Sequence, residues 1–188
     1  MKNIAILASG SGSNAENIIQ YFNQHPSIRI DSVWTNNPGA YVMERAERLK
    51  IEAHIFTKAD LVSTDHLLNE FKTRKIDLIV LAGFLLLLPH KFVREFRVVN
   101  IHPALLPAYG GKGMYGEHVH RAVIDNGEKE SGITIHLVDE VYDHGEILFQ
   151  ARCSIGPQDN PDSLAGKIHQ LEMKHFPRVI EELLAKSN

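Results

Sequence analysis

An amide and an imidazole stand two residues apart in the segment Asn100-Ile101-His102-Pro103. On an extended strand, alternate side chains point to the same side, so Asn100 and His102 can reach one small group. An amide donor and a charged imidazole suit the oxyanion of a tetrahedral intermediate, where one such donor contributes about 3 kcal/mol to catalysis. The plainer interpretation is that Asn100 bonds to its own loop backbone and that His102 is a satisfied core histidine. These two residues alone leave both interpretations open.

Three carboxylates, those of Asp139, Glu140 and Asp143, lie in a loop between two apolar segments further along the chain. Acidic loops are usually only solvated. A carboxylate held beside His102, however, would favour the charged imidazole and could accept a proton relayed through water. The spacing does not indicate which of the three carboxylates faces His102.

A glycine turn follows the first apolar segment as Gly10-x-Gly12-x-x-Ala15. A strand before it and a helix after it are the context of a dinucleotide-binding turn. Such sites also need an acidic residue at the end of the second strand, and 35–37 read Thr-Asn-Asn. Backbone N–H groups of Gly12, Ser13 and Asn14 at a helix N-terminus therefore predict a site for a single phosphate. The alternative is a plain turn with glycine for a positive φ and serine as the N-cap.

Other reactive side chains give weaker signals. The single cysteine, Cys153, lies in a predicted strand and is interpreted as buried and inert. His118 and His120 resemble a metal-binding pair, but two-residue spacing on a helix directs their side chains apart. No serine occupies a G-x-S-x-G elbow, which disfavours a serine hydrolase. A bound metal is not expected.

Alternating strands and helices must position these residues. The predicted strands of the first half cover residues 4–8, 28–34, 53–56, 78–82 and 98–101, and the predicted helices cover 15–22, 40–49, 65–75 and 90–96. Crossovers of this length imply parallel pairing. In the second half, 118–124 is a predicted helix, and 133–138 and 147–151 are predicted to pair as an antiparallel annex. Asn160 and Pro161 predict the start of a terminal helix that runs to about Lys186.

Composition indicates an ordinary globular protein. The 188 residues are 44% hydrophobic and 23% charged, with a formal net charge of −3, which excludes a disordered chain and disfavours a nucleic-acid partner. The longest apolar run, 78–88, is shorter than the about 20 residues that a membrane helix needs. The N-terminus shows no apolar signal region, so we expect a cytoplasmic protein without a membrane partner.

Four segments together resemble one family. They are Ala8-Ser9-Gly10-Ser11-Gly12-Ser13-Asn14, Leu81-Ala82-Gly83-Phe84, Asn100-Ile101-His102-Pro103-Ala104-Leu105-Leu106-Pro107 and Tyr142-Asp143-His144-Gly145. In this order they resemble the folate-dependent phosphoribosylglycinamide formyltransferases, and the resemblance covers essentially the whole chain. It implies a single α/β formyltransferase domain over 1–188: a Rossmann-like open, mostly parallel sheet with helices on both faces and an antiparallel C-terminal annex. A phosphate-binding half covers about 1–100, and a folate-binding and catalytic half covers about 101–188.

The resemblance also implies a reaction. The formyl group would pass from 10-formyltetrahydrofolate, a co-substrate, to the amine of 5'-phosphoribosylglycinamide (glycinamide ribonucleotide), a step of purine biosynthesis. No metal takes part. The implied partners are these small molecules alone, with the chain a monomer or a weak homodimer.

Site residues follow from the resemblance position by position. The catalytic residues would be Asn100, His102 and Asp143. The phosphate-binding residues would be Gly12, Ser13 and Asn14, and the glycinamide-binding residues would be His169, Gln170, Leu171 and Glu172, with Glu172 the closest contact. The folate-binding residues would be Leu85, Leu86, Leu87, Leu88, Asn100, Asp139, Glu140, Val141, Tyr142 and Asp143.

The sequence departs from the family pattern at Leu86, where relatives carry a basic residue, so a contact to the folate's glutamyl tail is missing or replaced. Alternatives are another 10-formyltetrahydrofolate-dependent formyltransferase, acting on methionyl-tRNA or an amino sugar, and a hydrolase that releases formate from the folate. Those proteins carry further domains. A non-catalytic sensor that binds a phosphorylated metabolite at the glycine turn is the alternative from another class.

Overall fold

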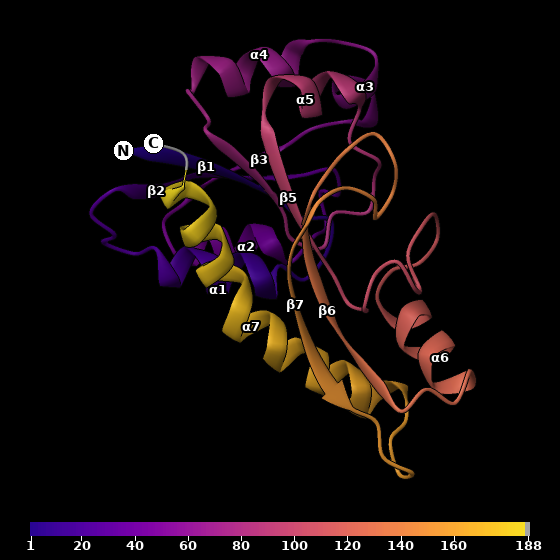
Figure 1. Cartoon of the computed structure of the whole chain (residues 1–188). Coiled ribbons are helices and arrows are strands. Elements are labelled where there is room, and N and C mark those ends of the chain that lie inside the picture. Colours follow the sequence, from indigo (N-terminus) through magenta and orange to yellow (C-terminus); the bar gives the residue numbers. More distant parts are fainter. Residues whose placement is uncertain (187–188) are drawn as a thin grey trace. The chain divides into compact units, whose positions relative to one another are not determined.

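Seven strands form the framework of the computed structural model, which describes residues 1–186 (Figure 1). The strands are β1 (Lys2–Leu7), β2 (Ile28–Thr35), β3 (Glu52–Ile55), β4 (Leu78–Leu81), β5 (Arg97–His102), β6 (Glu130–Leu137) and β7 (Ile147–Ser154). The helices are α1 (Ser13–Tyr21), α2 (Val42–Arg48), α3 (Lys58–Val62), α4 (His66–Thr73), α5 (His90–Glu95), α6 (Glu117–Asp125) and α7 (Pro161–Ala185). The sheet is mixed and mostly parallel, with the order β3-β2-β1-β4-β5-β6-β7. The predicted fold class is therefore confirmed.

The chain divides into two compact units, Met1–Val99 and a second that begins at Asn100. β5 passes from the first unit into the second. The expectation of a single domain over 1–188 stays a prediction. The last two residues of the expected C-terminal half, 187–188, lie outside the described part of the chain.

Parallel pairing organises the first unit. β1 pairs in parallel with β2 and β4, and β2 pairs in parallel with β3. The run 4–8 of β1 and its exit is fully buried, and so are nearly all of the β4 side chains. Strands buried on both faces need a layer of helices on each side. Figure 1 shows that layering within the unit, with α1 and α2 on one side of the strands and α3, α4 and α5 on the other.

The second unit contains the predicted annex. β6 and β7 pair antiparallel from Glu130 opposite Ser154 to His136 opposite Ile147. α7 packs along both strands and α6 packs against α7 (Figure 1). The predicted start of α7 is confirmed, because Asn160 and Ser163 form a capping box in which each side chain bonds to the other residue's backbone N–H.

The structure differs from the sequence interpretation in three local details. No helix was expected between the predicted strand 53–56 and residue 65, but the Thr57 and Asp60 side chains cap the short helix α3 there. β7 continues to Ser154, so that Cys153 is only half-buried rather than buried, although burial still raises the pKa of its thiol. The N-cap of α1 is Gly12, not the serine of the alternative plain-turn interpretation.

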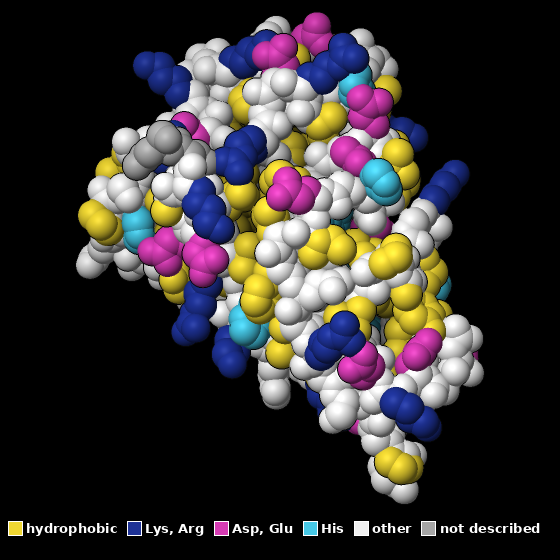
Figure 2. All heavy atoms as spheres, viewed as in Figure 1, with side chains coloured by type: hydrophobic (Ala, Val, Ile, Leu, Met, Phe, Trp, Pro, Cys, Tyr) yellow, Lys and Arg dark blue, Asp and Glu magenta, His cyan; other side chains and the backbone are white. Residues whose placement is uncertain are grey.

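Charges of both signs cover the surface. The face in Figure 2 shows Lys and Arg side chains interspersed with Asp and Glu, in keeping with the net charge of −3. Within residues 1–186, every helix is too short or too polar to cross a membrane.

Candidate functional site

Asn100 and His102 occupy alternate positions on β5, as predicted. The segment that follows β5 is held in place by β6 and β7. Thr134 Oγ1 of β6 accepts a hydrogen bond from the Leu106 N–H at 2.9 Å, and Gln150 Nε2 of β7 donates to the Leu106 carbonyl at 3.0 Å. His102 is 3% exposed and Asn100 is half-buried. The end of β5 is therefore a rigid and largely dry position for both side chains.

Asp143 is the carboxylate that faces His102. Its Oδ1 lies 3.4 Å from His102 Nδ1, and its side chain is only 11% exposed. Burial raises the pKa of the Asp143 carboxyl. The hydrogen bond and charge of His102, together with a hydrogen bond from the Gly111 N–H, lower this pKa by more than burial raises it. The net pKa lies below the ordinary value. Asp143 is thus an ionised carboxylate at neutral pH.

The other two carboxylates of the acidic loop point elsewhere. Asp139 pairs with His144 and accepts a hydrogen bond from the Val141 N–H at 2.8 Å. Glu140 is exposed. Asp143 alone of the three has a positive φ, +52°, and this left-handed backbone directs its side chain inward. The spacing in the sequence carried no signal for this choice.

A glycine-rich loop, residues 109–116, covers the His102–Asp143 pair with its backbone. His102 Nε2 lies 2.8 Å from the carbonyl oxygen of Tyr109, and the Gly111 N–H donates to Asp143 Oδ2 at 2.9 Å. Tyr109 itself has a φ of +57°, and its hydroxyl donates to Glu128 at 2.6 Å and accepts from Asn126 at 2.9 Å. The sequence interpretation assigned no role to Tyr109.

His136 is a second residue that sequence reasoning missed. It lies on β6, is 1% exposed, and its Nε2 is 3.2 Å from Asn100 Nδ2. Its Nδ1 is 2.9 Å from the carbonyl of Leu137, an acceptor only, so Nδ1 carries the proton and Nε2 accepts from Asn100. Burial lowers the pKa of His136, which keeps the ring neutral. One of the two amide hydrogens of Asn100 is thereby bound, and the other stays available. The available signal was a histidine between apolar neighbours, Ile135 and Leu137, in a predicted strand.

The glycine turn lies in the first unit, where the ends of three strands meet. Ser9 Oγ donates to Asn36 Oδ1 at 2.7 Å and accepts from the Leu85 N–H at 3.1 Å, and so links the exits of β1, β2 and β4. Gly12 has a φ of +74°, and a Cβ there would lie 2.4 Å from Val42 Cγ2. The turn therefore requires glycine on two grounds. The N–H groups of the first turn of α1 have no acceptor within the helix and can bind an anion.

The expected folate-binding segment 85–88 is a loop after β4 in the first unit. The side chains of Leu85 and Leu87 are exposed by 48% and 40%, whereas Leu88 is buried in the core. Leu85 also commits its N–H to Ser9. Direct side-chain contact is therefore open to Leu85, Leu86 and Leu87, but not to Leu88.

Two of the four expected glycinamide-binding residues share a face of α7. His169 Nδ1 lies 3.6 Å from Glu172 Oε2, and the Glu172 side chain is 14% exposed. Gln170 is exposed and Leu171 half-buried. The helix thus brings His169 and Glu172 together and directs Gln170 away from them.

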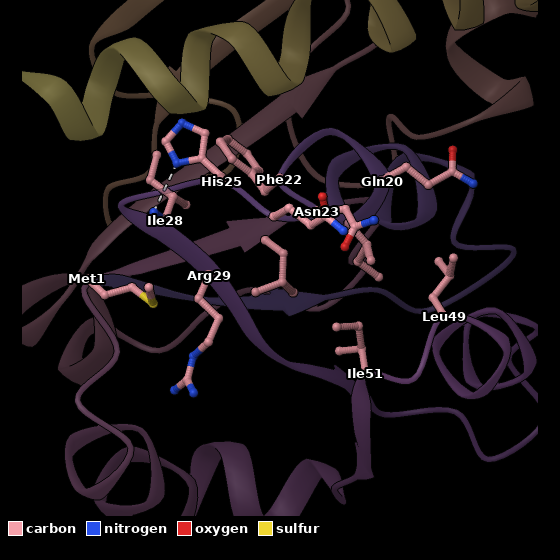
Figure 3. Close-up of a pocket in the computed structure, with 12 residues that line it drawn as sticks. Met1, Gln20, Phe22, Asn23, His25, Ile28, Arg29, Leu49 and Ile51 are labelled. Carbon is pink, nitrogen blue, oxygen red and sulfur yellow. Dashed lines mark hydrogen bonds between the residues drawn. The ribbon is translucent and has the colours of Figure 1, made fainter.

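A cavity of about 320 Å³ in the first unit is lined by other residues than these (Figure 3). Ile28, Leu49 and Ile51 contribute apolar walls, and the Ile28 N–H donates to His25 Nδ1 at 3.0 Å. Its walls come from the C-terminal end of α1, the start of β2 and the segment between α2 and β3, whereas the glycine turn precedes α1. The cavity contains none of the predicted site residues.

The second unit thus supplies two groups that can stabilise a negatively charged oxygen, Asn100 and His102, and one carboxylate that can hold a proton, Asp143. This set suits acyl transfer without a covalent intermediate. Within residues 1–186, no three His, Cys, Asp or Glu side chains are grouped to hold a metal ion.

Known proteins are similar to this chain in sequence and in fold. Residues 2–180 match the family model described as formyl transferase. The chain is 40% identical to the trifunctional purine biosynthetic protein adenosine-3 of Drosophila melanogaster, over 97% of this chain and 14% of that protein. It is 38% identical to the chloroplastic phosphoribosylglycinamide formyltransferase of Arabidopsis thaliana, over 95% of this chain and 64% of that protein. The chain thus spans less than two thirds of the length of either relative.

A solved structure gives the same result for the fold. Glycinamide ribonucleotide transformylase 1 from Geobacillus kaustophilus superimposes with a TM-score of 0.88 and 35% identity, over 98% of this chain and 99% of that one. Because the family model covers nearly the whole length and the fold agrees over that length, the chain belongs to the formyl transferase family.

Proposed function

We propose that this chain transfers the formyl group of 10-formyltetrahydrofolate to the amine of glycinamide ribonucleotide. The observation that carries the proposal is the pairing of His102 with Asp143 at 3.4 Å. Asn100 lies on the same strand as His102, two residues before it. A relative and a solved structure at 35–38% identity bear the names of that activity. The implied partners are the two small molecules, with the folate as co-substrate and no metal. A cytoplasmic location and a monomer or weak homodimer belong to the same proposal.

The proposed chemistry is direct attack. The neutral amine adds to the formyl carbon, and the carbonyl oxygen becomes an oxyanion held by the second amide hydrogen of Asn100 and by His102. The amine nitrogen then loses a proton through water to Asp143. The bond from carbon to the folate nitrogen breaks, and that nitrogen takes a proton from His102. Proton return from Asp143 to His102 restores the starting state.

The remaining predicted residues are assigned to the parts of the two substrates. Gly12, Ser13 and Asn14 bind the phosphate, and Glu172 with His169 binds the glycinamide. Gln170 and Leu171 stay expected members of this segment, between His169 and Glu172 on α7. The folate binds along Leu85, Leu86 and Leu87 and along 139–143, with backbone groups at Leu88. The uncharged Leu86 leaves the glutamyl tail without a side-chain cation at that position.

One experiment tests the reaction and the role of Asp143 together. The chain is mixed with glycinamide ribonucleotide and a 10-formyl folate, and the absorbance change is followed as the formyl group leaves. We expect turnover in the wild type. Asp143→Asn, whose side chain tolerates the left-handed backbone, should keep phosphate binding and lower kcat by about 100-fold or more.

Two results would contradict the proposal. Binding of the ribonucleotide without turnover would favour a sensor, and release of formate without the amino substrate would favour a folate hydrolase. Turnover near the wild-type rate in Asp143→Asn would remove Asp143 from the mechanism while leaving the activity in place.

A further inference from the structure

His120 on α6 is a buried imidazole for which the mechanism above has no use. The residue is 7% exposed, and its Nδ1 is buried without a hydrogen-bond partner in the described part of the chain. Buried side-chain polar atoms normally have a partner, and leaving one unsatisfied is unfavourable. The imidazole of His120 can therefore form a further hydrogen bond to a bound ligand.

His120 lies near residues of the candidate site in the second unit. α6 packs against α7, which carries Glu172. Both Glu172 and His102 are close enough to His120 to act on it electrostatically. Glu172, in turn, pairs with His169. His120 thus shares its environment with the carboxylate proposed to bind glycinamide and with the imidazole proposed to bind the oxyanion.

The protonation state of His120 decides what it can bind. Burial lowers the pKa of its imidazole, Glu172 raises it by less, and His102 lowers it further, so that the net pKa lies below 6.5. At neutral pH the ring is uncharged and has one bare nitrogen, which is an acceptor. With the ring proton on Nε2, the unsatisfied Nδ1 is the bare nitrogen, and the partner that it lacks is a donor such as the N–H of a primary amine.

We propose that His120 is a substrate-binding residue: it accepts a hydrogen bond from the amine of the amino substrate, beside the carboxylate of Glu172. The inference rests on the proposed function, because it assigns the group that orients the nucleophile of that reaction. His120 and Glu172 would each accept one N–H of the substrate amine. The lone pair of the amine nitrogen then points in a defined direction, as attack on the formyl carbon requires. No proton transfer to His120 is involved.

The test compares two ligands on one substitution. His120→Phe removes both ring nitrogens and keeps a planar ring. Binding is measured by titration calorimetry with glycinamide ribonucleotide and with its acetamide counterpart, which has a methyl group in place of the aminomethyl group. We expect His120→Phe to weaken binding of the amine-bearing ligand about tenfold and binding of the acetamide ligand by less than about twofold.

Kinetics and stability add readouts that a structural role would not give. The KM for the amino substrate should rise about tenfold and kcat should fall, while the KM for the folate stays unchanged. His120→Asn, which places an amide oxygen near the Nδ1 position, should restore most of the binding. The unfolding midpoint of His120→Phe should not be lower than that of the wild type, because the substitution removes an unsatisfied buried nitrogen.

The matched control is His118→Phe on the exposed face of the same helix, which should leave both affinities unchanged. Equal weakening of both ligands by His120→Phe would show a packing role and overturn the inference, as would unchanged binding of both. If the larger ring destabilises the fold, His120→Leu supplies the same comparison. Failure of the wild type to bind or use glycinamide ribonucleotide would instead overturn the proposed function, a result that involves no variant.

Discussion

His102 Nε2 and the carbonyl oxygen of Tyr109 lie 2.8 Å apart, while His102 Nδ1 lies 3.4 Å from Asp143. Both partners are hydrogen-bond acceptors. The Tyr109 carbonyl therefore occupies the nitrogen that the proposed oxyanion would use. Substrate must replace the Tyr109 carbonyl at that nitrogen.

The loop should open more often when the Tyr109 hydroxyl is removed. Tyr109→Phe loses the hydrogen bonds to Glu128 and Asn126, each worth about 1 kcal/mol at an exposed position. Trypsin cleavage after Lys112, an exposed residue of the same loop, should accelerate about fivefold, measured as the rate at which the two fragments form. Tyr115→Phe, in the same loop, is the control and should leave the rate unchanged. Equal rates for all three proteins would show that the hydroxyl does not hold the loop.

Acid stability should depend on Asp143. Its pKa in the folded chain lies below its ordinary value of 3.8, so the carboxylate contributes stability above about pH 4 and the contribution disappears as the pH falls through the folded pKa. Asp143→Asn should therefore lower the free energy of unfolding at pH 7, measured by urea titration, by about the worth of one hydrogen bond to a charged group, roughly 1.5–3 kcal/mol, and the loss should shrink as the pH falls below 4. Asp159, with a pKa of about 2 from its bonds to Lys167, Gly156 and Ser163, titrates in both proteins and cancels in the difference. A difference independent of pH would rule out this linkage.

His136 should act on the reaction only through Asn100. His136→Phe removes the acceptor at 3.2 Å and frees the Asn100 amide to rotate, so that kcat should fall about tenfold. A double-mutant cycle with Asn100→Ala checks the route, because the double variant should be no slower than Asn100→Ala alone. Losses that multiply would mean that His136 has an independent role.

The two glycines of the phosphate turn should differ in their tolerance of alanine. At Gly12, with a φ of +74° and Val42 Cγ2 at 2.4 Å from a new Cβ, alanine should destabilise the fold by about 2–4 kcal/mol. At Gly10 a new Cβ meets nothing within 4 Å, and alanine should change stability by less than about 0.5 kcal/mol. Urea denaturation of both variants measures the difference. Similar losses at both positions would show that the turn relaxes around Val42.

Local patterns in the sequence determined the strands, most of the helices and the family. Buried strands such as Leu78–Leu81 are uniformly apolar, and Asn160 with Ser163 marks the start of α7, because these signals depend only on residues close together in the chain. The alternation of Asn100 and His102 on β5 likewise follows from strand geometry. The short helix α3 was missed because its capping pair, Thr57 and Asp60, spans a segment too short to show a period.

Only the tertiary structure decided which polar groups meet. Asp143 was one of three carboxylates, and its left-handed backbone and the loop above it selected it over Asp139 and Glu140. His136 reached Asn100 through the pairing of distant strands, and His120 became a buried imidazole near Glu172 through the packing of α6 on α7. Contacts between residues far apart in the chain depend on register, packing and backbone direction together, and no local spacing records that combination.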